Sequence, residues 1–321
     1  MLKVVVRFTV MLGLVFVAAA ICFAGMPQKW SDLPKAVQDT ILANGGTKET
    51  PVDKESELVD GKALYEAAVK DKDGNVLDLQ ITADGKLIEI KTDDAADAAK
   101  ERVERGKKIL STVKFSHPRE ITNPYLPLAT LKQDILEGKE GKDKIRIERT
   151  AKPEIRKTYM INNQTVETFC VEDRELVNGA LAEVALDYFS QDDSGTVFYL
   201  GEDVDEYKDG KVVGHSGTWH FGRDTQSPGI LFPANPKVGD KFMSEDVSKD
   251  IHENDEIISL TETVTTPAGT YNNCVKLKEV LADGDVEYKY FAKGVGVVRE
   301  VPEDGDVLLI SHAAVAAKPA K

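Results

Sequence analysis

Apolar positions in the first hundred residues follow a helical pattern and then alternating patterns. Leu33, Val37 and Ile41 lie on one face of a helix over residues 33–44, and a glycine pair at 45–46 follows it. Four strand-like segments come next, separated by Asp-Gly turn sequences, at residues 56–59, 63–70, 76–83 and 86–92. This order predicts a helix packed on an antiparallel meander, because the apolar stripe of the helix can cover the apolar face of the sheet.

The remainder of the chain shows a different pattern. Residues 93–118 begin with aspartates, continue with alanines and have lysines near the end of the helical pattern, which is the charge order expected of a linking helix. Over residues 119–312, short strand-like segments recur between turn signals such as Asp192–Gly195. We expect an antiparallel β domain there, either a curved sheet or an open barrel, with the curved sheet favoured, and a disordered tail over 313–321. The predicted fold class is therefore α+β.

A basic and apolar segment opens the chain. Basic residues precede an apolar run over residues 8–20, and a stretch of small residues ends at Ala24. This pattern is typical of a secretory signal peptide, and the run is short for a membrane span. We expect residues 1–24 to be cleaved, which leaves no transmembrane segment and places the protein in the periplasm or outside the cell. Cys22 raises the alternative of lipid modification, which the bulky Ile21 before it disfavours.

Composition narrows the class of partner. The 321 residues include 41 Lys and Arg against 55 Asp and Glu, a net charge of −14, and 41% are hydrophobic. The hydrophobic content suffices for a packed core, and the length suggests about two domains at roughly 150 residues each. The charge argues against a nucleic-acid-binding surface and favours a cationic partner. Because the acids are spread over turns and strand faces in both domains, we interpret them mainly as a soluble exterior.

Three motifs in the first module carry a resemblance. They are Leu-Pro-Lys-Ala-Val at 33–37, Asp-Gly-Lys-Ala-Leu-Tyr-Glu at 60–66 and Ile-Thr-Ala-Asp-Gly-Lys-Leu-Ile at 81–88. In this order they resemble the PepSY-like, β-lactamase-inhibitor-like domains of exported bacterial proteins, over residues 27–92. The resemblance implies a small α+β module that binds other molecules and in some relatives inhibits peptidases. It brings no catalytic residues with it.

The second half of the chain is similar to a group of exported bacterial β proteins of no established function. The motifs concerned lie at 123–128, 187–189, 197–203, 217–219, 228–230, 238–240 and 288–298. Where those relatives have further glycine and alanine after the tryptophan, this chain has Arg223–Ser227. The departure argues against a fixed active-site loop at this place.

Four carboxylates form the strongest candidate site. Glu183 and Asp187 are four residues apart on a predicted strand and so share a face, and the next turn would bring Glu202 and Asp203 alongside them. Carboxylates gathered in this way bind Ca²⁺. A close pair among Glu183, Asp187 and Glu202 would instead supply the acid and base of a hydrolase of carbohydrate or peptide bonds. An ordinary solvated strand face is the third interpretation.

Aromatic residues gather in the β domain. Tyr199, Trp219 and Tyr290 are candidates for lining a concave apolar pocket that would hold a small apolar ligand. The same residues would also serve as the core of a domain of this size, and a core and a pocket can share a wall.

Two cysteines remain after signal cleavage. An oxidising compartment permits a disulfide between Cys170 and Cys274, and two separately buried thiols are the alternative, because pairing requires a Cα separation that the sequence does not specify. Residues 71–75 hint at a calcium loop, but they lack the glycine and glutamate spacing of an EF-hand.

The five histidines are scattered, and the sequence has no nucleophile-elbow or metalloprotease motif. These observations predict an exported, non-enzymatic binding protein with a protein or peptide partner of positive charge, and with no cofactor unless Ca²⁺ binds. A carrier or sensor of a small apolar ligand in the β domain is the first alternative. A carboxylate-dependent hydrolase is the second.

Overall fold

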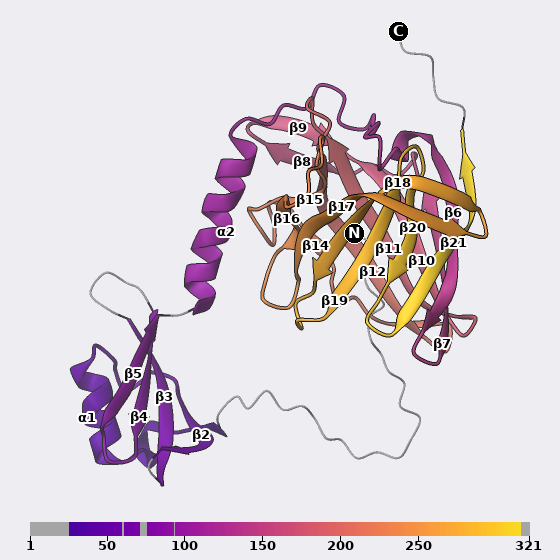
Figure 1. Cartoon of the computed structure of the whole chain (residues 1–321). Coiled ribbons are helices and arrows are strands. Elements are labelled where there is room, and N and C mark those ends of the chain that lie inside the picture. Colours follow the sequence, from indigo (N-terminus) through magenta and orange to yellow (C-terminus); the bar gives the residue numbers. More distant parts are fainter. Residues whose placement is uncertain (1–25, 60, 71–75, 93, 316–321) are drawn as a thin grey trace. The chain divides into compact units, whose positions relative to one another are not determined.

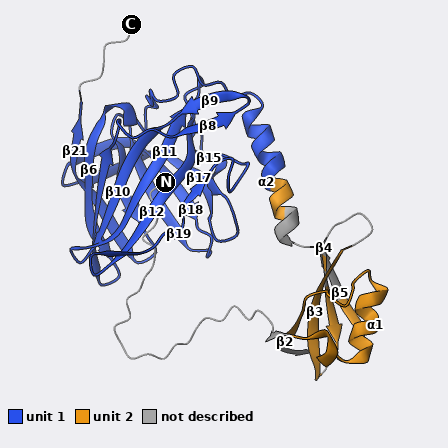
Figure 2. Cartoon of the chain, turned by 180° about the vertical axis from the view of Figure 1, so that it is seen from behind, with its two compact units in different colours: residues 1–8, 102–321 blue, residues 9–101 orange. Residues whose placement is uncertain are grey.

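The computed structural model describes residues 26–59, 61–70, 76–92 and 94–315 (Figure 1). They form two compact units, one up to Glu101 and the other from Arg102 onward (Figure 2). The α+β class, with a small helix-and-meander module before a larger antiparallel β domain, is confirmed. The predicted signal peptide with Cys22, the turn residue Asp60, the loop 71–75 and the tail residues 316–321 lie outside the described residues. No helix in the described ranges combines the length and the apolar character needed to cross a membrane.

The smaller unit is a five-stranded antiparallel sheet with one helix against it. In sheet order the strands are β1 (Met26–Pro27), β2 (Val52–Val59), β3 (Lys62–Lys70), β4 (Val76–Thr82) and β5 (Leu87–Thr92). Helix α1 (Lys35–Ala43) follows a 3₁₀ turn, η1 (Trp30–Asp32), and lies against one face of the sheet (Figure 1). The two residues of β1 are too few to show an alternating pattern in the sequence.

The core of this unit joins the helix to the sheet, as the apolar stripe predicts. Val37 and Ile41 of α1 are fully buried and pack with Leu79 of β4. The helix ends at a glycine cap, in which Gly45 takes a φ of 90° and the Gly46 N–H donates a hydrogen bond of 3.0 Å to the Ile41 carbonyl. A left-handed residue at this point favours glycine, so the sequence stops the helix here.

Helix α2 (Asp94–Leu110) follows β5, and its C-terminal part belongs to the larger unit. Arg105 donates two hydrogen bonds to the Asp246 carboxylate, of 2.7 and 3.0 Å. A Cβ atom on Gly106 would lie 2.0 Å from the carbonyl oxygen of Gln226. A glycine in mid-helix is otherwise unfavourable, so its place here follows from close packing, and this end of the helix is docked rather than a free linker.

The larger unit is built on an antiparallel sheet of fourteen strands. Along the main path the order is β13 (Lys211–Gly214), β12 (Val197–Lys208), β11 (Ala180–Gln191), β10 (Phe169–Val177), β7 (Asp143–Ala151), β6 (Leu131–Glu140), β21 (Gly305–Ala314), β20 (Gly296–Val301), β19 (Val286–Ala292), β18 (Gly269–Val280), β17 (His252–Thr266) and β16 (Lys241–Asp246). Two short strands, β14 (Trp219–His220) and β15 (Gly229–Phe232), pair with β12. A separate hairpin and a 3₁₀ turn complete the unit, namely β8 (Thr158–Ile161), β9 (Gln164–Glu167) and η2 (Leu128–Thr130).

The large sheet curves around a common interior (Figure 1). Most neighbours are joined by short turns, whereas the C-terminal strand β21 returns to pair with β6, with Leu309 opposite Leu136. Strand β15 lies between β12 and β16, because Gly229 allows a close approach: a Cβ there would be 1.9 Å from the Ser244 carbonyl oxygen. Two strands far apart on the sheet path are thereby brought together.

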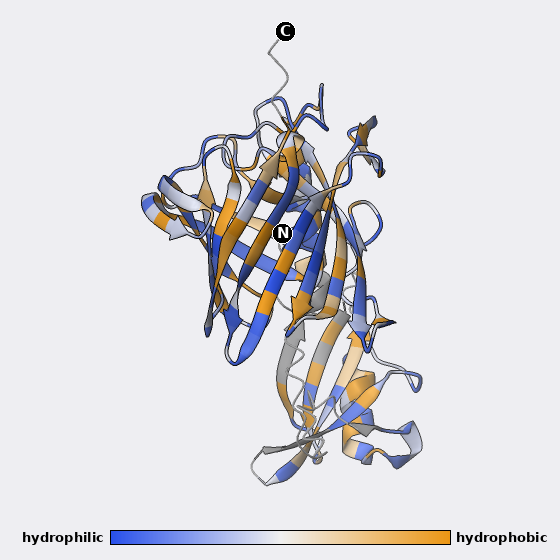
Figure 3. Cartoon of the chain, turned by 90° about the vertical axis from the view of Figure 1, so that its right-hand side faces the viewer, coloured by the Kyte–Doolittle hydropathy of each residue, from blue (hydrophilic) through white to orange (hydrophobic). Residues whose placement is uncertain are grey.

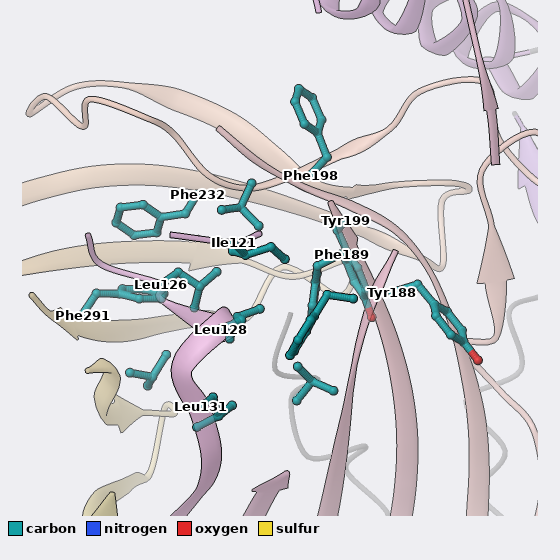
Figure 4. Packing of buried hydrophobic residues seen from close by; sticks show 14 of the residues in the cluster. Ile121, Leu126, Leu128, Leu131, Tyr188, Phe189, Phe198, Tyr199, Phe232 and Phe291 are labelled. Atoms are coloured by element: carbon teal, nitrogen blue, oxygen red, sulfur yellow. The ribbon is translucent and has the colours of Figure 1, made fainter. Parts of the chain in front are cut away.

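Hydrophobic and polar residues alternate along these strands, so that each strand presents two different faces (Figure 3). Part of the interior is apolar. Phe232 and Phe291 pack with ring centroids 4.7 Å apart, and Leu126, Leu128 and Phe189 belong to the same cluster (Figure 4). The remaining interior positions include many charged side chains, which form the candidate site.

Candidate functional site

The β11–β12 hairpin positions the four predicted carboxylates. Asp187 lies directly opposite Glu202, and the neighbouring pair places Asp203 opposite Leu186. Because successive residues of a strand face opposite sides, Asp203 points away from Glu202. Glu183, Asp187 and Glu202 are buried, whereas the Asp203 side chain is 44% exposed. The hairpin therefore brings three of the four to the interior and leaves the fourth outside. Within the described ranges, no group of three or more Asp, Glu, His or Cys side chains is arranged to hold a metal ion.

Asp203 belongs to a polar cluster on the outer face. Its carboxylate accepts hydrogen bonds from Lys157 Nζ at 2.9 Å and Tyr188 Oη at 2.7 Å, and it lies 2.9 Å from His220 Nε2. Tyr159 Oη is 2.9 Å from the other ring nitrogen of His220. Burial and the Lys157 ammonium lower the pKa of His220, which favours the neutral ring. His220 Nε2 also lies 2.9 Å from Lys157 Nζ, so these contacts tie β8 and β14 to the main sheet.

Tyr199 and Trp219 are fully buried in the core of the larger unit. Their rings meet edge to face, with centroids 5.2 Å apart. Tyr199 Oη donates a hydrogen bond of 2.8 Å to Asp187 Oδ1, and Trp219 Nε1 donates one of 2.8 Å to Glu245 Oε1. These two aromatic residues thus hold buried carboxyl groups in place.

Tyr290 occupies the outer face of β19. Its ring lies 5.4 Å from Lys276 Nζ and 5.3 Å from Arg299 Cζ, which are cation–π distances. Its neighbour Lys289 faces the interior and is buried. Tyr290 is therefore placed apart from Tyr199 and Trp219.

Cys170 and Cys274 are two separate buried thiols in this structure. The Cys170 Sγ lies 3.8 Å from the Val171 carbonyl oxygen, and the Cys274 Sγ lies 3.6 Å from that of Tyr271. Burial raises the pKa of the Cys170 thiol to about 12 and raises that of Cys274 above its ordinary value. Of the two arrangements expected from the sequence, the structure has the unbridged one.

The interior of the larger unit contains many more carboxyl groups than cations. Two basic side chains of its described residues are buried, Arg149 and Lys289. The buried acidic side chains are Asp134, Glu175, Glu183, Asp187, Glu202, Glu245, Asp246, Glu253, Asp255, Glu279, Glu287 and Glu300. Arg149 Nε lies 3.1 Å from an oxygen of Asp173, and Lys289 Nζ lies 2.6 Å from one of Glu279. The partly exposed Arg105 and His312 pair with Asp246 and Asp134, but ionised carboxyls would still outnumber the cations, which favours bound protons or further cations.

Burial shifts the protonation of these groups. It raises the pKa of Glu253 to about 7, with help from the Glu279 charge, and that of Glu287 to about 8. Burial, followed by the charges of neighbouring glutamates, raises the pKa of Asp255 well above its ordinary value. Burial alone would lower the pKa of Lys289, but the surrounding carboxylates outweigh it and raise that pKa. The interior is thus an acidic environment that favours bound protons and cations.

A cavity lies between the apolar and the charged parts of this interior. The volume of the cavity is about 30 Å³. Its apolar lining consists of Leu126, Leu128, Val171, Phe189, Leu231, Leu277, Phe291 and Val297. Its polar lining consists of Arg149, Asp173, Asp187, Ser244, Asp255, Glu279 and Lys289. Tyr199, Trp219 and Tyr290 are not among the lining residues.

Asp255 is the exceptional group of this lining. Asp255 is almost completely buried, with 2% of its surface exposed. Oδ2 accepts a hydrogen bond of 3.0 Å from the Ser244 N–H, whereas Oδ1 accepts none from the described residues. Almost all buried polar atoms in native proteins have a partner, so this oxygen calls for an explanation.

Sequence reasoning misses the cavity residues on β17 to β19. In β19 the residues Glu287 and Lys289 alternate with Tyr288 and Tyr290, so either set fits a buried face. The aromatic set is the natural choice for the core, but the structure buries Glu287 and Lys289 with Phe291, and of the two tyrosines it buries Tyr290 and leaves Tyr288 half-buried. The alternation of acid and base at the charged positions is the signal that would have pointed to the interior.

No protein-family model, curated protein or solved structure matches this chain. The resemblance to PepSY-like domains therefore stays a prediction.

Proposed function

We propose that this chain is an exported, non-enzymatic binding protein whose ligand occupies the interior cavity of the large sheet. The observation that supports this most directly is Asp255, a residue that lines the cavity and whose buried oxygen Oδ1 accepts no hydrogen bond from the described residues. Leaving such an atom without a donor costs roughly 1–3 kcal/mol, and more when it is charged. A bound molecule that donates a hydrogen bond would remove this cost. Export rests on the predicted signal peptide.

The size of the cavity limits the ligand. One water molecule needs about 10–15 Å³ of the same kind of volume, so about 30 Å³ holds two or three waters or a molecule of a few heavy atoms. Pockets for drug-sized or lipid-like ligands have roughly 300–1,000 Å³. The geometry thus favours a small ligand over the lipid-like one that curved sheets elsewhere enclose.

Hydrolysis fits the same residues less well. Asp187 and Glu202 are the natural acid–base pair, since the strand register places them opposite each other. Glu202 is fully buried, and Asp187 already accepts the hydrogen bond of Tyr199. A glycosidase needs a scissile bond between its two carboxyls, which are about 5–10 Å apart, and this cavity has no room for a sugar ring. The burial of Asp187 and Glu202 therefore favours a binding function over hydrolysis.

The proposal is tested by native mass spectrometry of the full chain purified from the export compartment. We expect a bound mass that is released on denaturation. Asp255→Asn should lose that mass, because the amide removes the charge at nearly constant shape, and Asp304→Asn, an exposed turn carboxylate, should keep it. A protein that carries no bound mass and whose thermal midpoint responds to no small molecule would contradict the proposal.

A second candidate function, recognition of a protein or peptide, is favoured by the edge of the smaller sheet. Within the described residues, β5 pairs with β4 alone, so its other edge offers free backbone groups. Ile88 on this strand is 38% exposed. An extended segment can add to such an edge, and the net charge of −14 favours a segment that carries lysine or arginine.

Affinity capture from periplasmic extract tests this candidate. Ile88→Lys adds a positive charge to the edge strand and should weaken saturable capture by about tenfold or more. The matched control is Leu42→Lys, at an apolar position of α1 that is 45% exposed, and it should not affect capture. Equal capture by both variants would rule out the edge of β5 as the binding site.

A further inference from the structure

The residues that line the cavity of the large sheet limit the chemical class of its ligand as well as its size. Eight of its lining side chains are apolar, and Figure 4 shows how Leu126, Leu128, Phe189 and Phe291 of this set gather in the core. The other lining groups are four carboxyls, two cations and the serine Ser244. A ligand that fills this space contacts mainly apolar side chains and lies next to these polar groups on one side.

The four carboxyls on the polar side outnumber its two cations, and burial raises the pKa of two of them, Asp187 and Asp255, so these two hold protons unless a cation is bound beside them. Arg149 is occupied by Asp173, to which its guanidinium donates hydrogen bonds of 3.1–3.3 Å, and Lys289 is occupied by Glu279 at 2.6 Å. Both cations of the lining thus have a carboxylate each.

The remaining two carboxyls have neutral donors. Asp187 accepts a hydrogen bond from Tyr199 Oη, and Asp255 accepts one from the Ser244 N–H. Asp255 Oδ1 accepts none. A molecule that carries positive charge and N–H donors is complementary to this part of the wall.

We infer that the cavity binds a small organic amine, with its ammonium group beside Asp255 and Asp187 and a short apolar group against the leucine and phenylalanine side chains. This inference rests on the proposed function and names its ligand class. An ammonium supplies three N–H donors, of which one satisfies Asp255 Oδ1. Phe189 and Phe291 offer aromatic rings in the same lining, which attract cations at close range.

Other ligand classes fit the lining less well. A neutral alcohol would donate a hydrogen bond but supply no positive charge to stabilise the ionised form of Asp255, and a carboxylic acid would add a further acid to the site. A metal ion prefers several carboxylates in one coordination sphere, and no such group exists among the described residues. An inorganic ammonium ion would leave the apolar part of the cavity unfilled.

The test compares three organic probes of similar size, and one smaller ion, on the full chain. They are n-propylamine, n-propanol, propionate and inorganic ammonium, at one pH and one ionic strength, with binding measured by calorimetry and by the thermal midpoint. We expect n-propylamine to bind more tightly than the other three. Asp255→Asn should weaken its binding by about tenfold or more, the loss expected for one hydrogen bond to a charged group, and Asp304→Asn should leave it unchanged.

The outcomes separate this inference from the proposed function. Tighter binding of propanol, propionate or inorganic ammonium would overturn the amine assignment and leave a binding function. Absence of binding by every probe, together with absence of a bound mass, would overturn both. If Asp255→Asn binds n-propylamine as well as the wild type does, the site has been misplaced. Asp187→Asn then serves as the second variant, and circular dichroism confirms that each variant is folded.

Discussion

Lys289→Met is the substitution that tests the charge balance of the interior most sharply. It removes one of the two buried cations and keeps a long apolar side chain in its place. Lys289 Nζ lies 2.6 Å from Glu279 Oε2, with the two side chains 3% and 4% exposed. We expect the variant to fold at mildly acidic pH and to be strongly destabilised above neutrality.

The magnitude follows from the cost of a proton. At an effective dielectric constant of about 20, charges 2.6 Å apart interact by roughly 6 kcal/mol, so a buried carboxyl that loses its cation takes up a proton instead. An unfolded glutamate titrates near pH ~4.3, and each pH unit above this costs about 1.4 kcal/mol. Proton uptake therefore costs about 4.4 kcal/mol at pH 7.5 and about 1.6 kcal/mol at pH 5.5. The loss of stability should grow by about 2.7 kcal/mol between the two.

Neighbouring groups act in the same direction. The Lys289 charge lowers the pKa values of Glu253 and Glu287, which nevertheless lie at about 7 and about 8. Without this charge both pKa values rise further, so more protons are bound by the folded state than by the unfolded state at pH 7.5. The value of about 2.7 kcal/mol is thus a lower limit for the change between the two pH values.

The assay is urea unfolding at pH 5.5 and pH 7.5, followed by tryptophan fluorescence and extrapolated to water. Lys293→Met, at an exposed position, is the control for loss of a lysine and should change stability little at either pH. The double variant Lys289→Met with Glu279→Gln should lose most of the pH dependence that Lys289→Met adds to that of the wild type, because the unpartnered carboxyl is gone and Glu253 and Glu287 titrate in both proteins. An equal loss of stability at both pH values would refute the reasoning.

Three further predictions concern other parts of the structure. The pKa of Glu287 is raised to about 8, so its stabilising protonated form is complete below its ordinary pKa of 4.5 and is lost as the pH rises through about 8. Glu287→Gln should flatten this decline in urea unfolding, and Asp304→Asn should not. Gly106→Ala should destabilise the fold by about 1–3 kcal/mol through overpacking, and so lower the thermal midpoint, although alanine is the better helix former. A higher midpoint would mean that the helix is not docked. Cys170 and Cys274 should react with a thiol reagent after unfolding and not before, and a protein without titratable thiols in denaturant would show a disulfide instead.

The smaller unit could be predicted from the sequence because its information is local. Each strand from β2 to β5 is next to its sequence neighbour in the sheet, and each turn has its own Asp-Gly signal. The helix stripe of α1 and the glycine cap after it are likewise contained in a dozen residues. Where pairing is local, alternation and turn chemistry suffice to define the elements and their order.

The interior of the larger unit could not be predicted, because it is assembled from distant strands. The pairing of β21 with β6 joins positions almost 180 residues apart, such as His312 and Asp134, and no turn sequence announces it. The acidic segment around Glu253 and Asp255 has the composition of a solvated edge. Both residues are buried because the sheet curves over them, so the interpretation of the acidity as a soluble exterior holds for part of the chain and fails for this part.

The buried carboxyls connect stability to binding. The interior of the large sheet has two ways to compensate its negative charge, the fixed cations Arg149 and Lys289 and protons on groups such as Glu287, and the proposed ligand amine beside Asp255 would be a third. The first is set by the sequence, and the second weakens as the pH rises. A ligand amine would therefore stabilise the fold most where protons stabilise it least. If Lys289→Met increases the stabilisation by n-propylamine at pH 7.5, the three contributions share one charge balance, because a ligand cation can then replace the missing lysine.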